Sequence, residues 1–182
     1  MSNVSNGAGE GPSGKRGAVL VVGVGAEFGG DDSVGRYAVR RLASEGGLPA
    51  HVDVTEASGE GTVLMSLWKG YGAVFIVDAA SSGAAAGTVH RFDTVEDAVP
   101  TGFFRYSTHA FGVAEALALA RILDELPPRC VVYGIEGRDF AHGAPRAPEV
   151  EAAAETALAR IREEIACLEN VQPSGAGESP RC

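Results

Sequence analysis

Short apolar runs alternate with amphipathic segments along most of this chain. The segments 18–25, 73–80 and 130–136 are nearly continuous in aliphatic residues, which is typical of parallel strands buried on both faces. The segments 51–57 and 88–93 alternate between apolar and polar residues, which predicts strands with one more exposed face. We therefore expect a sheet of about five strands, in which the three apolar runs are central.

Helical periodicity fills the intervals between most of these strands. The four segments with apolar residues three and four apart are 33–46, 61–71, 108–126 and Val150 to Leu168. Strands that alternate with helices predict a three-layer α/β sandwich, with a mainly parallel sheet and helices on both faces. Because no helical pattern separates 73–80 from 88–93, we expect 88–93 to be the one antiparallel strand.

The two ends of the chain differ from the middle in composition. Residues 1–16 and 170–182 are rich in Gly, Ser and Pro and hold few aliphatic side chains. Such segments bury too little apolar surface to offset the entropy of ordering, so both are expected to be flexible tails around one domain at 17–169. The first apolar run begins near Ala18 and is too short for a signal peptide or a membrane span.

Net charge and cysteine content narrow the class of protein further. The net charge is −9, from 15 Lys and Arg against 24 Asp and Glu, which argues against nucleic acid or an anionic membrane as the partner. The three cysteines, Cys130, Cys167 and Cys182, form no CxxC pair and suit a reducing compartment. We therefore expect a cytoplasmic protein.

Acidic residues and one histidine fall where a ligand site is expected. In an open α/β sheet, ligands bind outside the carboxyl ends of the parallel strands. Asp31 and Asp32 follow the first strand, Asp78 ends the third and Glu136 ends the last, while His109 stands at the start of the predicted helix 108–126. These side chains can therefore converge on one rim of the sheet.

Each candidate also has a structural interpretation. Asp31 or Asp32 can be the N-cap of helix 33–46, and Asp78 can bind loop amides. Nucleotide binding is disfavoured, because Phe28 stands where the dinucleotide fingerprint needs Gly and the adjacent acids repel a pyrophosphate. A lone histidine such as His109 is more often structural than a ligand.

The grouping of carboxylates with one imidazole favours a metal site. Near a helix N-terminus His109 stays neutral, as a ligand must, and two carboxylates with one imidazole suit Zn²⁺, Ni²⁺ or a related ion. His142, in the loop 137–148, is the reserve candidate. No Ser-His-Asp or Cys-His arrangement and no H-E-x-x-H pair is evident.

Four short motifs, in this order, resemble the hydrogenase maturation proteases. They are Gly23-Val24-Gly25 with Asp31-Asp32-x-x-Gly35, then Val77-Asp78-Ala79 with Gly87-Thr88-Val89, then Ser107-x-His109, then Gly134-Ile135-Glu136 with Pro148-Glu149-Val150. Members of this family are endopeptidases that trim a C-terminal extension from the large subunit of nickel–iron hydrogenases after nickel insertion. The resemblance extends from about Ala18 to Ile165.

The resemblance implies a site and a partner. By position, the family's proposed nickel contacts fall on Asp32, Asp78 and His109, which would be both the metal-binding and the catalytic residues. It implies a monomeric aspartic-type endopeptidase that activates a hydrogenase by processing its large-subunit precursor, with nickel presented by that precursor and no nucleotide cofactor. The alternative is a non-cleaving maturation chaperone of the same fold that binds nickel or the precursor.

The chain departs from the family pattern at three loop positions. Ala26 replaces the usual Asn, Ser33 replaces a common Gly, and Gly137 replaces the usual Pro. All three positions lie in loops that we expect to touch the substrate tail. The substitutions therefore bear on partner identity and activity more than on the fold.

Overall fold

The computed structural model describes residues 17–97, 99, 100, 102–104 and 111–170, which form a three-layer α/β sandwich. The strands are β1 (Val19–Val24), β2 (Val52–Ala57), β3 (Ala73–Ala80), β4 (Val89–Asp93) and β5 (Arg129–Glu136). The helices are a 3₁₀ turn η1 (Gly30–Ser33), α1 (Val34–Glu45), α2 (Gly61–Trp68), α3 (Val113–Ile122) and α4 (Pro148–Asn170). The predicted tails, 1–16 and 170–182, lie outside the described residues except Asn170, which belongs to α4.

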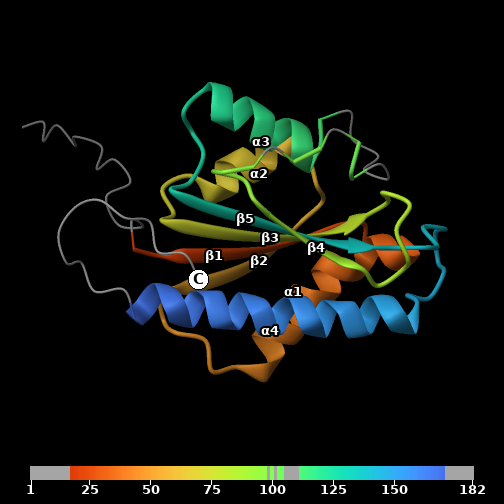
Figure 1. The fold of residues 1–182 in the computed structure, drawn as a ribbon. Helices are drawn as coiled ribbons and strands as arrows, with labels where there is room; N and C mark the ends of the chain where they lie inside the picture. Colours follow the sequence, from red (N-terminus) through yellow and green to blue (C-terminus); the bar gives the residue numbers. More distant parts are fainter. Residues whose placement is uncertain (1–16, 98, 101, 105–110, 171–182) are drawn as a thin grey trace, which may run out of the picture.

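The sheet has the predicted strands and directions. Its order is β2-β1-β3-β5-β4, in which β4 runs antiparallel to β5 and every other neighbouring pair is parallel. Every residue of β1 and β3 is buried, which explains why these segments carry no polar alternation. Helices α1 and α4 cover one face of the sheet and α2 and α3 cover the other, as Figure 1 shows.

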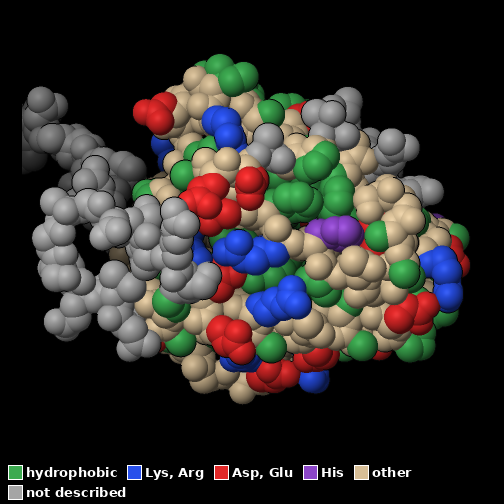
Figure 2. Space-filling view, in the orientation of Figure 1, with side chains coloured by type: hydrophobic (Ala, Val, Ile, Leu, Met, Phe, Trp, Pro, Cys, Tyr) green, Lys and Arg blue, Asp and Glu red, His purple; other side chains and the backbone are tan. Residues whose placement is uncertain are grey.

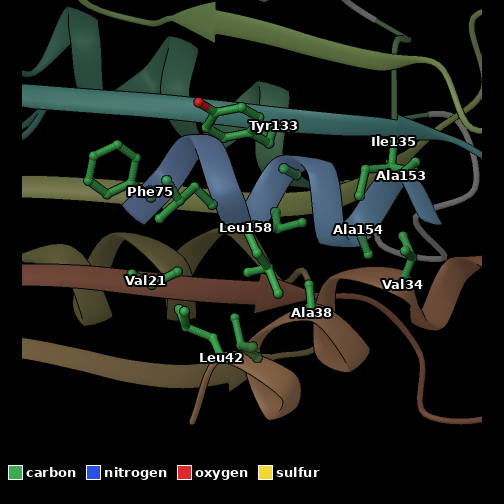
Figure 3. Close-up of a cluster of buried hydrophobic side chains, with 14 of the residues drawn as sticks. Val21, Val34, Ala38, Leu42, Phe75, Tyr133, Ile135, Ala153, Ala154 and Leu158 are labelled. Atoms are coloured by element: carbon green, nitrogen blue, oxygen red, sulfur yellow. The ribbon is translucent and has the colours of Figure 1, made fainter. Parts of the chain in front are cut away.

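Each face of the sheet has its own hydrophobic core. On the α1/α4 face, alternate residues of β1, β3 and β5, such as Val21, Phe75 and Tyr133, pack against Leu42 and Leu158 (Figure 3). On the other face, the intervening strand residues pack against side chains that include Leu64, Trp68, Val113 and Leu117. Because β1, β2, β3 and β5 are parallel, the loops that follow their carboxyl ends lie on one rim of the sheet.

Helix α3 is shorter than the predicted 108–126. It begins at Val113, after an N-terminal turn in which the Gly112 N–H donates to Glu115 Oε2 at 3.0 Å. It ends at Ile122, where Asp124 adopts a left-handed φ of 56° and the Glu125 N–H donates to the Ala120 carbonyl at 2.8 Å. The apolar periodicity continues beyond both ends, so the backbone hydrogen bonds of the two caps set the limits of the helix.

A partly buried ion cluster joins α4 to the edge of the sheet. Glu164 on α4 accepts two hydrogen bonds from Arg91 of β4, at 2.8 and 2.9 Å, and one from Arg129 of β5 at 2.6 Å. Although burial raises the pKa of Glu164, hydrogen bonds from Arg91, Tyr133 and Arg129 outweigh it and bring the pKa down to about 2. The cluster thus needs an ionised Glu164.

We expect acid to weaken the protein through this cluster. A carboxyl whose folded pKa lies below its usual 4.5 stabilises the fold above pH 4.5, and that contribution is lost as pH falls toward 2. Melting curves between pH 6 and 2 should show this loss, and Glu164→Gln should flatten the slope over the same interval. An unchanged slope in the variant would remove Glu164 as a source of acid sensitivity.

Candidate functional site

Asp32 and Asp78 share a small cavity at the carboxyl ends of β1 and β3. The cavity has a volume of about 30 Å³, enough for a water molecule or a single metal ion. The residues that line it are Val24, Gly25, Ala26, Asp32, Ser58, Gly59, Asp78, Ala79 and Phe104. The loops after β1, β2 and β3 therefore meet here, as the rule for open α/β sheets requires.

A tight turn after β1 brings Asp32 back to the strand end. Gly25 has a φ of 138°, and a Cβ at this position would lie 1.8 Å from the Asp32 carbonyl oxygen. Only glycine allows this approach. The Asp32 carboxylate then accepts a hydrogen bond from the Ala26 N–H at 2.7 Å, which fixes the side chain at the start of the loop after β1.

Asp78 is a buried carboxyl with little compensation. Its side chain accepts a hydrogen bond from the Ala79 N–H at 2.8 Å, and the residue is 5% exposed. Burial, and then the charge of Asp32, raise the pKa of Asp78 well above its usual 3.8. Burial also raises the pKa of Asp32, against the lowering effect of the Ala26 N–H.

The pair can therefore do two kinds of chemistry. Two carboxyls that repel one another hold a proton between them at a higher pH than either would alone, as acid–base pairs do. The same repulsion is relieved by a divalent cation, for which carboxylate oxygens are good ligands. Within the described part of the chain, no three His, Cys, Asp or Glu side chains are grouped as a metal site.

Asp31 has a different role from its neighbour. It is fully buried, and its carboxylate accepts hydrogen bonds from the N–H groups of Arg138, Asp139 and Ala147 at 2.8, 2.9 and 2.7 Å. It therefore ties the loop after β5 to the 3₁₀ turn η1 instead of facing the cavity. The expected convergence of Asp31 on the site is wrong.

Neither aspartate caps helix α1. The N-cap position is Ser33, whose hydroxyl donates to the Gly30 carbonyl at 2.6 Å and accepts from Arg146 Nη1 at 2.8 Å. The N-cap interpretation of Asp31 or Asp32 is thus wrong for both residues. The reason is the 3₁₀ turn η1, which places both aspartates one turn before α1 begins.

Glu136 and His142 also lie away from the cavity. The Glu136 carboxylate accepts hydrogen bonds from the loop after β3, at Ser82 and Gly83. His142 is exposed, with its ring centroid 6.0 Å from that of Phe28. Neither lines the cavity, so the predicted convergence holds in the structure for Asp32 and Asp78.

The segment that carries Ser107 and His109 falls outside the described residues, so the placement of His109 stays a prediction. The flanking aromatic residues are described. Phe104 lines the cavity, and the Phe111 carbonyl accepts a hydrogen bond from the Gly61 N–H at 2.9 Å at the start of α2.

Sequence reasoning missed three residues of the cavity wall. Ser58 and Gly59 follow the carboxyl end of β2, so the rule that located Asp78 also applies to them. Phe104 belongs to an irregular stretch with no periodic signal, and nothing in the sequence points to it.

Of the three departures from the family pattern, Ala26 lines the cavity, whereas Ser33 is buried beside Arg146. Gly137 lies where the loop after β5 packs against Asp31, and a Cβ at this position would be 2.9 Å from the Cβ of Asp31.

The charged surface and the length of the helices can be compared with what the composition predicts. Among the described side chains on the face in Figure 2, acidic and basic groups are interspersed, without a large field of one sign. None of the described helices is both long and apolar enough to cross a lipid bilayer.

Comparison with known proteins gives consistent matches. A family model described as hydrogenase maturation protease matches residues 37–164. The chain is 27% identical over 157 residues to the hydrogenase expression/formation protein HupD of Rhodobacter capsulatus, covering 85% of this chain and 74% of that one.

Solved structures match the fold over a similar span. The hydrogenase maturating endopeptidase HybD from E. coli superposes with a TM-score of 0.70 at 24% identity, covering 82% of this chain and 92% of that chain. The [NiFe] hydrogenase maturation protease HybD from Thermococcus kodakarensis gives a TM-score of 0.60 at 26% identity, covering 82% and 99%.

Proposed function

The chain belongs to the hydrogenase maturation protease family, and from this premise we propose that it removes a C-terminal extension from the nickel-loaded large-subunit precursor of a nickel–iron hydrogenase. The observation that carries the proposal is the pair Asp32 and Asp78, two carboxyls with raised pKa values on one cavity at the carboxyl ends of β1 and β3. A cavity of this size and acidity suits a cation or a water molecule better than an organic cofactor.

In this proposal, nickel is part of the substrate. Asp32 and Asp78 contribute two oxygen ligands to the nickel of the precursor, and His109 contributes the third ligand as an imidazole. Support for His109 comes from Phe104, which lines the cavity and lies five positions earlier in the sequence. Docking of the metal would hold the scissile bond in register, so a precursor without nickel would not be cut.

Hydrolysis then requires a water molecule and a proton path. Through an oxygen that does not contact nickel, a carboxylate of the pair accepts a proton from the water as the water oxygen attacks the carbonyl carbon. The same carboxyl then donates that proton to the leaving nitrogen as the C–N bond breaks.

One observation favours the alternative of a binding protein that does not cut. Ala26 lines the cavity where the family usually has Asn, so an amide that could hold the substrate is missing. Incubation with a nickel-loaded precursor distinguishes the two functions. A shortened product supports the peptidase, whereas a stable complex without cleavage supports the chaperone.

We expect the isolated protein to bind Ni²⁺ or Cd²⁺ at this cavity. His109→Ala should weaken binding at least about tenfold, since it removes one of three ligands at about 2.0–2.2 Å. Affinity should fall as pH drops through the titration of the imidazole, because a protonated histidine cannot ligate. Calorimetric titration measures both effects, and His142→Ala is the matched control. Equal affinity of wild type and His109→Ala would remove His109 from the site.

A further inference from the structure

Glu136 is a buried acid that the proposed hydrolysis does not use. It ends β5 and is 1% exposed. Its Oε1 accepts a hydrogen bond from the Gly83 N–H at 2.8 Å, and its Oε2 accepts one from the Ser82 hydroxyl at 3.0 Å. Both donors belong to the loop that leaves β3 just after Asp78. Burying a carboxylate costs free energy unless hydrogen bonds from its neighbours compensate for the lost contact with water.

His90 approaches the same carboxylate from β4. Its Nε2 lies 3.5 Å from Glu136 Oε2, and this buried nitrogen has no hydrogen-bond partner among the described residues. In the sheet, Asp78 and His90 are both in register with Gly134 of β5, one on each side. Gly134, the residue that separates Asp78 from His90 across the sheet, therefore contributes no side chain of its own.

The ring of Phe103 fills the space above Gly134. A Cβ on Gly134 would lie 2.6 Å from Phe103 Cε1, so this packing requires glycine. The Phe103 ring makes T-shaped contacts with two other rings. Its centroid lies 4.8 Å from that of the His90 ring and 5.2 Å from that of the Phe104 ring. The Phe103 carbonyl also accepts a hydrogen bond from the Ser81 N–H at 3.1 Å.

These contacts link Glu136 to the wall of the cavity. The carboxylate fixes the loop after β3, and this loop holds Phe103 through Ser81. Phe103 in turn packs against Phe104, which lines the cavity with Asp32 and Asp78. The pairing of β3 with β5 is already made by backbone hydrogen bonds, so the carboxylate is not needed to form the sheet.

We propose that Glu136 is a positioning residue of the peptidase: with His90, it holds the loop after Asp78 and the Phe103–Phe104 wall in the geometry that cleavage needs. The inference rests on the proposed function. It predicts that loss of the carboxylate slows the chemical step more than it weakens precursor binding, because Glu136 itself does not touch the cavity.

The test compares Glu136→Gln with the wild type in processing of a nickel-loaded precursor. We expect kcat to fall about tenfold or more, as for partners that orient active-site groups, while KM changes less than about twofold. Glu163→Gln, on the exposed side of α4, is the matched control and should process normally. A melting curve for each variant allows kcat to be expressed per folded molecule.

Two further variants separate positioning from general stability. His90→Gln keeps an N–H group that can face Glu136 and should retain most activity, whereas His90→Leu should lose as much kcat as Glu136→Gln. Ser82→Ala removes one hydrogen bond of the carboxylate and should lower kcat severalfold even if Glu136→Gln does not fold. Wild-type kcat in Glu136→Gln, or in Ser82→Ala if the former is unfolded, overturns the inference.

Failure of the proposed function gives a different result. If the wild type forms a complex with the precursor and does not cut it, the peptidase proposal fails, and the dissociation constant becomes the readout. A positioning role then predicts about tenfold weaker binding by Glu136→Gln. Unchanged binding overturns the inference, and absence of both cleavage and complex with the wild type overturns both proposals.

Discussion

We expect Asp78→Asn to leave the precursor unprocessed while the protein still folds. Asparagine keeps the shape of the side chain and can still accept the hydrogen bond from the Ala79 N–H. It cannot donate or accept a proton as a carboxyl does, and it is a poor ligand for a divalent cation. We expect processing to fall at least about a hundredfold, which is the usual effect of losing a general acid or base. Gel analysis of the precursor over time measures it.

The same substitution should raise stability at neutral pH. A carboxyl whose folded pKa lies above its usual 3.8 stabilises the fold below pH 3.8, and that contribution is lost as pH rises through the folded pKa. At pH 7 the wild type therefore carries the cost of a buried charge or of taking up a proton, and the neutral amide carries neither. The melting temperature of Asp78→Asn should be higher than that of the wild type at pH 7 and equal to it at pH 3.5.

Controls for Asp78→Asn come from the same rim. Asp32→Asn keeps the acceptor for the Ala26 N–H and should also fold without processing the precursor. Glu60→Gln changes an exposed acid at the start of α2, outside the cavity, and should process normally. Full processing by both Asp32→Asn and Asp78→Asn would defeat the proposed site, although the family assignment would stand.

Asp31→Asn has the opposite signature, with a large loss of stability. The Asp31 carboxylate accepts three N–H groups, two on Oδ2 and one on Oδ1. An amide offers one oxygen, so its NH₂ group must face at least one of these donors. Since a hydrogen bond to a charged group contributes about 1.5–3 kcal/mol, we expect a loss of about 2–4 kcal/mol in the free energy of unfolding.

Chemical denaturation of Asp31→Asn and Asp32→Asn gives the comparison directly. The two residues are adjacent and carry the same substitution, so each is the control for the other. Asp32→Asn should not lower the free energy of unfolding, because the backbone partner is kept and the substitution removes a charge that burial disfavours. If Asp31→Asn were as stable as the wild type, the loop after β5 would not depend on this carboxylate.

The sequence by itself determined the sheet. The apolar runs of β1, β3 and β5 are long because these strands are buried on both faces, and a pattern of that kind is local. The direction of β4 also followed from the chain, since a parallel return needs a crossover that the segment between β3 and β4 is too short to make. Strand direction in turn fixed the rim on which Asp32 and Asp78 meet.

Only the tertiary structure decided which acids line the cavity. Asp31 and Asp32 are adjacent, yet one carboxylate binds amides more than 100 positions later in the chain and the other faces the cavity. Glu136, like Asp78, stands at the carboxyl end of a parallel strand, but its carboxylate accepts hydrogen bonds from Ser82 and Gly83. Strand patterns are set by periodicity within a segment, whereas the environment of a carboxyl is set by loops that pack against it from distant parts of the chain.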